Sequence, residues 1–168
     1  QQALTDHGNI FGAIEFYECC QRVGITPIIG CELYVASGSR FDRKSSSKDE
    51  ENPQKASINH LTVVARDNEG YQNLIELTTR ASLEGFYYKP RVDKELLAQY
   101  SKGLTALSGC LKGETAQALL KDNEELALSR IDKLRDIFGK ENFYLEIMDH
   151  GLESQKKVNT ALIAIAGK

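Results

Sequence analysis

The sequence has 168 residues, which is enough for one domain with a substantial hydrophobic core. Hydrophobic residues make up 41% of it and charged residues 27%, and the formal net charge of -3 argues against strong nucleic-acid binding by this segment alone. No apolar run approaches the ~20 residues of a membrane span and no signal peptide is recognisable, so we expect a cytoplasmic protein without a membrane partner.

Polar residues of the kinds that bind metals follow or interrupt the first two predicted strands. Residues 3–5 are expected to end a buried strand, and the Asp-His-Gly sequence after it places His7 at a turn. Apolar residues then recur at helical spacing over 10–23. The run 27–35 predicts a strand with Glu32 in its middle, where a carboxylate is costly unless it faces a polar site. For the Asp-His-Gly sequence the alternative is a simple turn in which Asn9 caps the next helix. For Glu32 the alternative is a side chain that points outward to solvent.

A change of composition precedes the next strand. Residues 37–57 contain serines, lysines, acids and one proline, and they predict an exposed variable loop. His60 then opens a strand over 61–65, and a helix is expected over 68–81. If the two strands were parallel, His60 would lie at the wrong end to meet Glu32, whereas a hairpin-like return through the loop would bring them together. The sequence leaves both arrangements open.

An aromatic and basic segment follows at 85–91. Aromatic rings beside Lys89 and Arg91 can grip a phosphate or a stacked base, which makes these two residues candidate contacts to phosphate or DNA at the mouth of a site. Packing of the rings across a barrel mouth, with the charges in solvent, explains the segment at least as well. A short helix is expected over 93–99.

The second half of the chain supplies one more candidate ligand, Cys110, at the end of a small strand over 104–110. A thiolate there is a good zinc ligand, although a buried free cysteine is the commoner role for this residue type. The four cysteines lack C-x-x-C spacing, so neither a zinc ribbon nor a disulfide framework is expected. A helix over 122–138 and a strand over 143–148 follow, and a second Asp-His-Gly sequence, 149–151, precedes the last helix.

The alternation of strands and helices predicts an α/β fold with a largely parallel sheet and a barrel-like layout, although too few strands are present to close a barrel. The candidate ligands form a mixed nitrogen, oxygen and sulfur set: His7, Glu32, His60 and Cys110. Ligands dispersed over successive strands suit a multinuclear catalytic metal site better than a compact structural zinc site. Phosphoester hydrolysis is the natural reaction of such a site. No Ser-His-Asp or Cys-His nucleophile pattern is convincing.

Seven sequence motifs extend this interpretation. They are ALTDHGN (3–9), GAIEFY (12–17), IIGCE (28–32), HLT (60–62), EGFYYKPRVD (84–93), LSGCLKGE (107–114) and DHGL (149–152). Together they run over nearly the whole chain apart from the 37–57 loop, and they resemble the PHP (polymerase and histidinol phosphatase) domain of the bacterial replicative DNA polymerase III alpha subunits. The resemblance implies a distorted seven-stranded β/α barrel, of which this chain would form a part.

The resemblance also implies a metal-dependent site. The implied ligands of a divalent metal cluster, of zinc, manganese or magnesium, are His7, Glu32, His60 and Cys110, and this sequence keeps the ligand type at all four positions. Some metal-competent members have 3′→5′ exonuclease activity on DNA, whereas in others the domain mainly supports the polymerase and docks the proofreading subunit. Asp149 and His150 match a family motif but are expected to be structural or to support the ligands.

The family begins with a strand that carries His-x-His and ends with one that carries Asp-x-His, and this sequence contains neither motif. We therefore expect a single incomplete PHP domain over 1–168, a fragment of a catalytic alpha subunit that binds metal incompletely and is inactive by itself. The parent would be a DNA-directed DNA polymerase, with DNA, the proofreading exonuclease subunit and other replisome subunits as partners. Two alternatives remain, a free-standing phosphatase of the histidinol phosphatase type and a non-catalytic scaffold.

Overall fold

The computed structural model describes residues 1–43 and 58–167. Its strands are β1 (Gln2–His7), β2 (Pro27–Ala36), β3 (Ile58–Ala65), β4 (Arg91–Val92), β5 (Leu104–Leu107) and β6 (Phe143–Tyr144). Its helices are α1 (Ala13–Val23), α2 (Asn68–Leu83), α3 (Lys94–Gln99), α4 (Glu114–Leu120), α5 (Glu124–Phe138) and α6 (Glu153–Ala166), with a 3-10 helix η2 (Lys140–Asn142). Among the helices in these two ranges, none has both the length and the apolar character that crossing a membrane requires.

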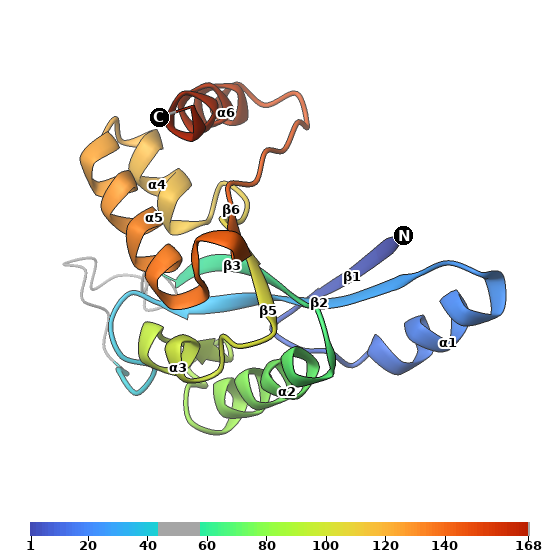
Figure 1. Ribbon diagram of the computed structural model, residues 1–168. Coiled ribbons are helices and arrows are strands. Elements are labelled where there is room, and N and C mark those ends of the chain that lie inside the picture. The colour runs from blue at the N-terminus through green and yellow to red at the C-terminus, as the bar shows by residue number, and fades with distance from the viewer. Residues whose placement is uncertain (44–57, 168) are drawn as a thin grey trace.

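One strand of the six-stranded sheet runs against the others. The strands lie in the order β1-β2-β3-β5-β6, and β4 pairs with the later part of β2. β3 is antiparallel to both of its neighbours, β2 and β5, whereas the remaining strands all run in one direction (Figure 1). The largely parallel sheet predicted from the alternation of elements is therefore present, with β3 as its exception. Within the described residues the sheet is open, with β1 and β6 at its two ends.

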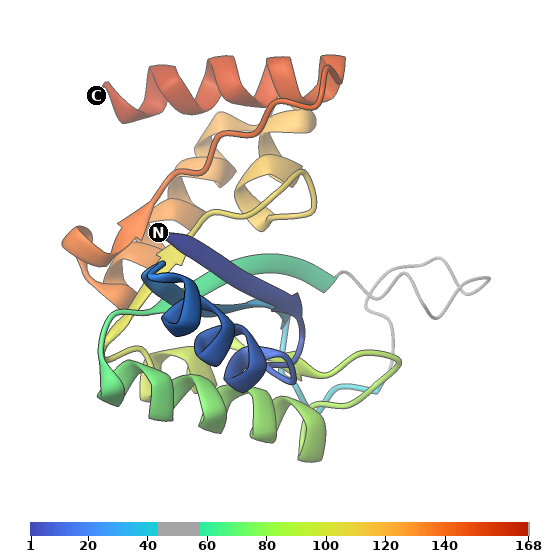
Figure 2. The ribbon, with the colours of Figure 1, turned by 90° about the vertical axis from the view of Figure 1, so that its right-hand side faces the viewer.

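The two faces of the sheet differ in chemistry because consecutive residues of a strand point to opposite sides. One face is apolar, and Leu33 of β2, Val63 of β3 and Ala106 of β5 are buried on it. These residues share a hydrophobic core with Leu77 of α2 and Leu97 of α3. Figures 1 and 2 show α2 and α3 beneath the sheet. The opposite face carries the polar side chains of the candidate site.

The remaining C-terminal helices form a stack on the other side of the molecule. Figure 2 shows α6 at the top, above α4 and α5, and α4 packs against both of its neighbours. Apolar residues at helical spacing bury one side of each helix, as Ile131 and Leu134 do in α5 and Val158 and Leu162 do in α6. Because α5 also contacts β5 and β6, this stack is attached to the edge of the sheet that these two strands form. Cys110 follows β5 shortly in the sequence.

The predicted exposed loop over 37–57 lies partly outside the described residues, at 44–57. Most residues of its described part, 37–43, are exposed as expected, and Arg40 is the buried exception. Arg40 Nη1 lies 3.0 Å from Asp93 Oδ1, and Arg40 Nε lies 2.7 Å from Glu84 Oε2. The charge of Arg40 is therefore neutralised by two acids that follow α2 and precede α3, which explains how an arginine can be buried there.

Candidate metal centre

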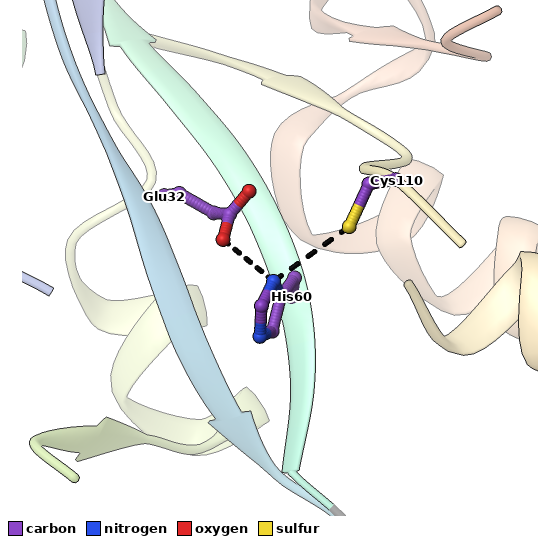
Figure 3. Close-up of side chains that lie close together, drawn as sticks. All are labelled: Glu32, His60 and Cys110. Carbon is purple, nitrogen blue, oxygen red and sulfur yellow. Dashed lines mark hydrogen bonds and ion pairs between the residues drawn. The ribbon is translucent and has the colours of Figure 1, made fainter. Parts of the chain in front are cut away.

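Three potential metal ligands from distant parts of the chain meet on the polar face of the sheet (Figure 3). A carboxylate oxygen of Glu32 in β2, a ring nitrogen of His60 in β3 and the sulfur of Cys110 after β5 all lie within 4.8 Å of one another. His60 Nδ1 is 2.5 Å from Glu32 Oε1 and 3.7 Å from Cys110 Sγ. The structure thus brings together three of the four ligands predicted from the sequence.

The fourth predicted ligand, His7, contacts the same carboxylate oxygen. His7 ends β1 and pairs with Glu32 in the parallel register of β1 and β2. Its Nδ1 atom lies 2.7 Å from Glu32 Oε1, and its ring centroid is 6.3 Å from that of His60. Most of the His7 side chain is exposed to solvent, so this histidine lies at the outer edge of the group.

The register of β2 and β3 explains why Glu32 and His60 meet. Glu32 lies opposite Thr62, and His60 lies opposite Tyr34, in this antiparallel pair. Residues two apart on a strand share a face, so all four side chains lie on the same side of the sheet. The hairpin-like arrangement is therefore the one that the structure adopts, and it removes the difficulty that parallel strands would have posed for His60.

A turn after β5 carries Cys110 back toward β3. Gly109 has a φ of 82°, in the left-handed region, and a Cβ added to it would lie 2.8 Å from the His60 carbonyl oxygen. The Lys112 N–H donates to Cys110 Sγ at 3.4 Å, and the Lys112 carbonyl accepts from the His60 N–H at 3.1 Å. The thiol is therefore held beside His60 by a backbone path that needs glycine at this turn.

Burial controls the protonation states around the site. It raises the pKa of the Cys31 thiol to about 12, so this cysteine, which precedes Glu32 and lies in the apolar core, stays protonated and offers no thiolate. Burial also lowers the pKa of His60, and the neighbouring Glu32 charge partly opposes that shift. His60 is consequently neutral near pH 7, which is the form of imidazole that binds metal.

Glu146, which follows β6, adds a carboxyl group that was not predicted as part of the site. Burial raises its pKa, and the nearby Glu32 charge raises it further. The Gly109 N–H and the Thr62 side chain lie near its carboxyl group and act to lower its pKa. Its Oε2 atom is buried and has no hydrogen-bond partner among the described residues. A sequence signal was available, because Glu146 interrupts an apolar predicted strand just as Glu32 does.

The chemistry of these groups fits a divalent cation. The Glu32 charge lies close enough to raise the pKa of Glu146, and one Glu146 oxygen lacks a partner among the described residues. A bound cation would offset both costs. The imidazole of His60 and the thiol of Cys110 are among the ligands that zinc and related metals prefer.

The two cationic residues predicted to contact phosphate have very different surroundings. Lys89 Nζ lies 5.4 Å from the ring centroid of Tyr34, and that ring packs edge-on against His60 at a centroid distance of 5.2 Å. Arg91, by contrast, is only 3% exposed. Its guanidinium donates to three backbone carbonyls, those of Arg40, Asp42 and Gly85. Arg91 therefore stabilises the loops around it and does not line the mouth of the site.

The second Asp-His-Gly sequence forms a turn before α6. Asp149 Oδ1 accepts from the Gly151 N–H at 2.9 Å, and His150 Nδ1 lies 3.0 Å from Gln155 Nε2. These contacts are local, and neither Asp149 nor His150 belongs to the group of potential ligands. Their surroundings agree with the structural role predicted for them.

Comparisons with known proteins identify a family for the chain. Residues 1–150 match the family described as PHP domain. The chain is 50% identical over 166 residues to a DNA polymerase III subunit alpha of Thermus aquaticus, an alignment that covers 99% of this chain and 13% of that protein. It is 48% identical over 164 residues to the protein of the same name from Treponema pallidum (98% and 14%) and 47% identical over 166 residues to that from Deinococcus radiodurans (98% and 12%). Because the family match covers most of its length, the chain belongs to the PHP domain family.

Proposed function

We propose that the chain is the PHP domain of a bacterial replicative DNA polymerase, the alpha subunit of DNA polymerase III. Proteins of that name from three organisms are 47–50% identical to nearly the whole chain, which spans only 12–14% of their length. The parent would be a DNA-directed DNA polymerase of the cytoplasm, with DNA, the proofreading exonuclease subunit and other replisome subunits as partners. In the complete domain the open sheet would belong to a distorted seven-stranded β/α barrel.

Within that parent, we propose a metal-dependent phosphoesterase centre with 3′→5′ exonuclease activity. The observation that carries this proposal is the meeting of Glu32, His60 and Cys110 within 4.8 Å on the polar face of the sheet. A divalent cation bound there neutralises phosphoryl charge and lowers the pKa of a water molecule. Zinc, manganese and magnesium are the candidates.

Different residues of the chain would bind the metal and the phosphate at such a centre. Glu32, His7 and His60 would hold the cation, because the Oε1 atom of Glu32 contacts ring nitrogens of both histidines. Cys110 would supply a sulfur ligand to the same group. Lys89, held over Tyr34 beside His60, would contact the phosphate of the substrate. Phosphate binding thus falls to an accessible lysine rather than to the buried Arg91.

The test uses the full-length protein that contains this chain. Cys110→Ser is compared with wild type and with Cys19→Ser, which changes an exposed cysteine of α1. The measurements are metal retained after dialysis, 3′→5′ degradation of single-stranded DNA, and primer extension. We expect Cys110→Ser to lower metal affinity and degradation about 10-fold or more, since even residues that only support metal ligands have effects of that order. Primer extension and the behaviour of Cys19→Ser should remain at wild-type levels.

Each alternative has its own outcome in this experiment. Metal retention by Cys110→Ser equal to that of wild type would contradict the proposed centre. A protein that hydrolyses a small phosphoester but extends no primer would be a free-standing phosphatase. A wild-type protein that extends primers but neither retains metal nor degrades DNA would leave the domain a scaffold.

A further inference from the structure

A hollow of about 650 Å³ adjoins the candidate metal centre. It lies between the loop that follows β1, one face of α2 and the loop that precedes β4. The residues that matter for its chemistry are His7, Phe11, Thr78, Leu83, Phe86 and Pro90. Its volume lies within the range of roughly 300–1,000 Å³ that is typical of small-molecule sites.

The hollow and the metal centre share structure. His7 lines the hollow and also contacts Glu32 at 2.7 Å. The neighbouring Gly8 lies so close to Pro90, on the hollow side, and to Tyr34, on the side of the centre, that an added Cβ would be 2.9 Å from both side chains. Tyr34 in turn packs against the ring of His60. His7 is therefore the residue at which the hollow and the group of potential ligands meet.

The hollow exposes large apolar side chains. Phe11 is 92% exposed, Leu83 80% and Phe86 57%. Three such residues around a single hollow indicate a binding surface, because scattered exposed residues would not gather in this way. Two of the three are aromatic, and aromatic rings stack on nucleobases with little preference for sequence.

We propose that this hollow binds the base of the 3′-terminal nucleotide of a single-stranded DNA whose phosphate lies at the metal centre. The proposal rests on the proposed function and adds the place where the substrate's base is held. The arrangement of charge supports it, since Lys89 lies over Tyr34 on the side of the centre while the hollow itself presents rings. A terminal nucleotide has the same two parts, an anionic phosphate next to a flat base.

The test measures binding without hydrolysis. A short single-stranded DNA with 2-aminopurine at its 3′ end is titrated with the full-length protein that contains this chain in metal-free buffer, and quenching of the fluorescent base reports stacking. A matched DNA ends in an abasic unit, and its binding is followed by anisotropy. Phe11→Ala removes a side chain that is 92% exposed, so the variant should keep the wild-type fold. Phe86→Ala is the second variant, and Tyr17→Ala changes an exposed aromatic residue that lies outside the hollow.

We expect the base-bearing DNA to be quenched by the wild-type full-length protein and to bind about 10-fold more weakly to its Phe11→Ala and Phe86→Ala variants, in line with the effect of losing one stacking ring. Tyr17→Ala should bind as wild type does, and the abasic DNA should not distinguish any of the proteins. Absence of quenching, as expected if another polypeptide segment occupies the hollow, would overturn the proposal. So would equal binding by wild type and Phe11→Ala.

The outcomes also separate this inference from the function on which it rests. Degradation of DNA by the full-length protein in the presence of metal, without quenching by the same protein, would overturn the base site and leave the metal centre intact. Quenching that depends on Phe11, in a protein whose full-length form retains no metal, would leave a nucleotide-binding hollow beside a centre with another role.

Discussion

Glu32 and His60 touch across a diagonal of the β2–β3 pair. His60 lies opposite Tyr34 and two residues from Thr62, the direct partner of Glu32, yet His60 Nδ1 is 2.5 Å from Glu32 Oε1. Long side chains reach such diagonal neighbours on an antiparallel pair. The contact joins a residue of the largely apolar strand β2 to the third residue of β3, and it creates the core of the candidate metal centre.

Glu32→Gln should lower the pKa of His60 further in the metal-free protein. Burial already lowers that pKa below the ordinary 6.5, and the negative charge of Glu32 and its hydrogen bond oppose the shift by favouring the imidazolium. A neutral amide removes this opposition, so His60 should stay neutral to a lower pH. An NMR titration of the three histidines checks this, with His150 as the internal control. An unchanged or higher pKa for His60 would contradict the assigned contact.

Glu146→Gln should stabilise the metal-free protein at alkaline pH. Because burial raises the pKa of Glu146 above its ordinary 4.5, the folded state holds the proton more tightly than the unfolded state does. This contribution to stability is complete below pH 4.5 and is lost as the pH rises through the folded-state pKa. The neutral amide avoids the loss, so the advantage of the variant should grow between about pH 4 and about pH 8. Urea unfolding at both values measures it, and the exposed Glu141→Gln should show no such growth.

Arg91→Lys should destabilise the fold, whereas Lys89→Ala should not. The buried guanidinium of Arg91 donates to the carbonyls of Arg40, Asp42 and Gly85. A lysine keeps the charge but cannot reach all three acceptors from one planar group, so we expect a loss of about 3 kcal/mol in the free energy of unfolding. Denaturant titration measures both variants. Lys89→Ala should instead weaken DNA binding at unchanged stability. If Arg91→Lys weakened DNA binding at unchanged stability and Lys89→Ala did not, Arg91 would be the phosphate contact.

Gly8→Ala should cost more stability than Gly24→Ala. The two glycines have nearly the same left-handed backbone, with φ of 70° and 71°. A Cβ at Gly24 would meet nothing within 4 Å, whereas one at Gly8 would lie 2.9 Å from Pro90 and Tyr34. The backbone cost of about 1–2 kcal/mol applies to both, and the close contact adds to it only at Gly8. Chemical unfolding of the pair isolates that contact, and a metal titration should show weaker binding for Gly8→Ala alone, since it displaces His7. An equal loss in the free energy of unfolding in the two variants would mean that the loop after β1 shifts at no cost to accommodate the added Cβ.

The sequence by itself determined the chemical character of the site and most of the elements around it. A glutamate inside an apolar strand has to face a polar group, which is why Glu32 could be identified, and the same argument applies to Glu146. Apolar periodicity located the helices, because a 3.6-residue repeat is a local property of the chain. The strand of β2 was predicted over 27–35 and is observed as Pro27–Ala36.

Only the tertiary structure decided which of these residues meet. The direction of β3 sets whether His60 reaches Glu32, and that direction depends on hydrogen bonds between strands far apart in sequence. The roles of Lys89 and Arg91 also separate only in the fold, because two basic residues of one loop look alike until burial and carbonyl partners distinguish them. Side-chain type is a local property of the sequence, whereas proximity and burial arise from contacts between distant segments.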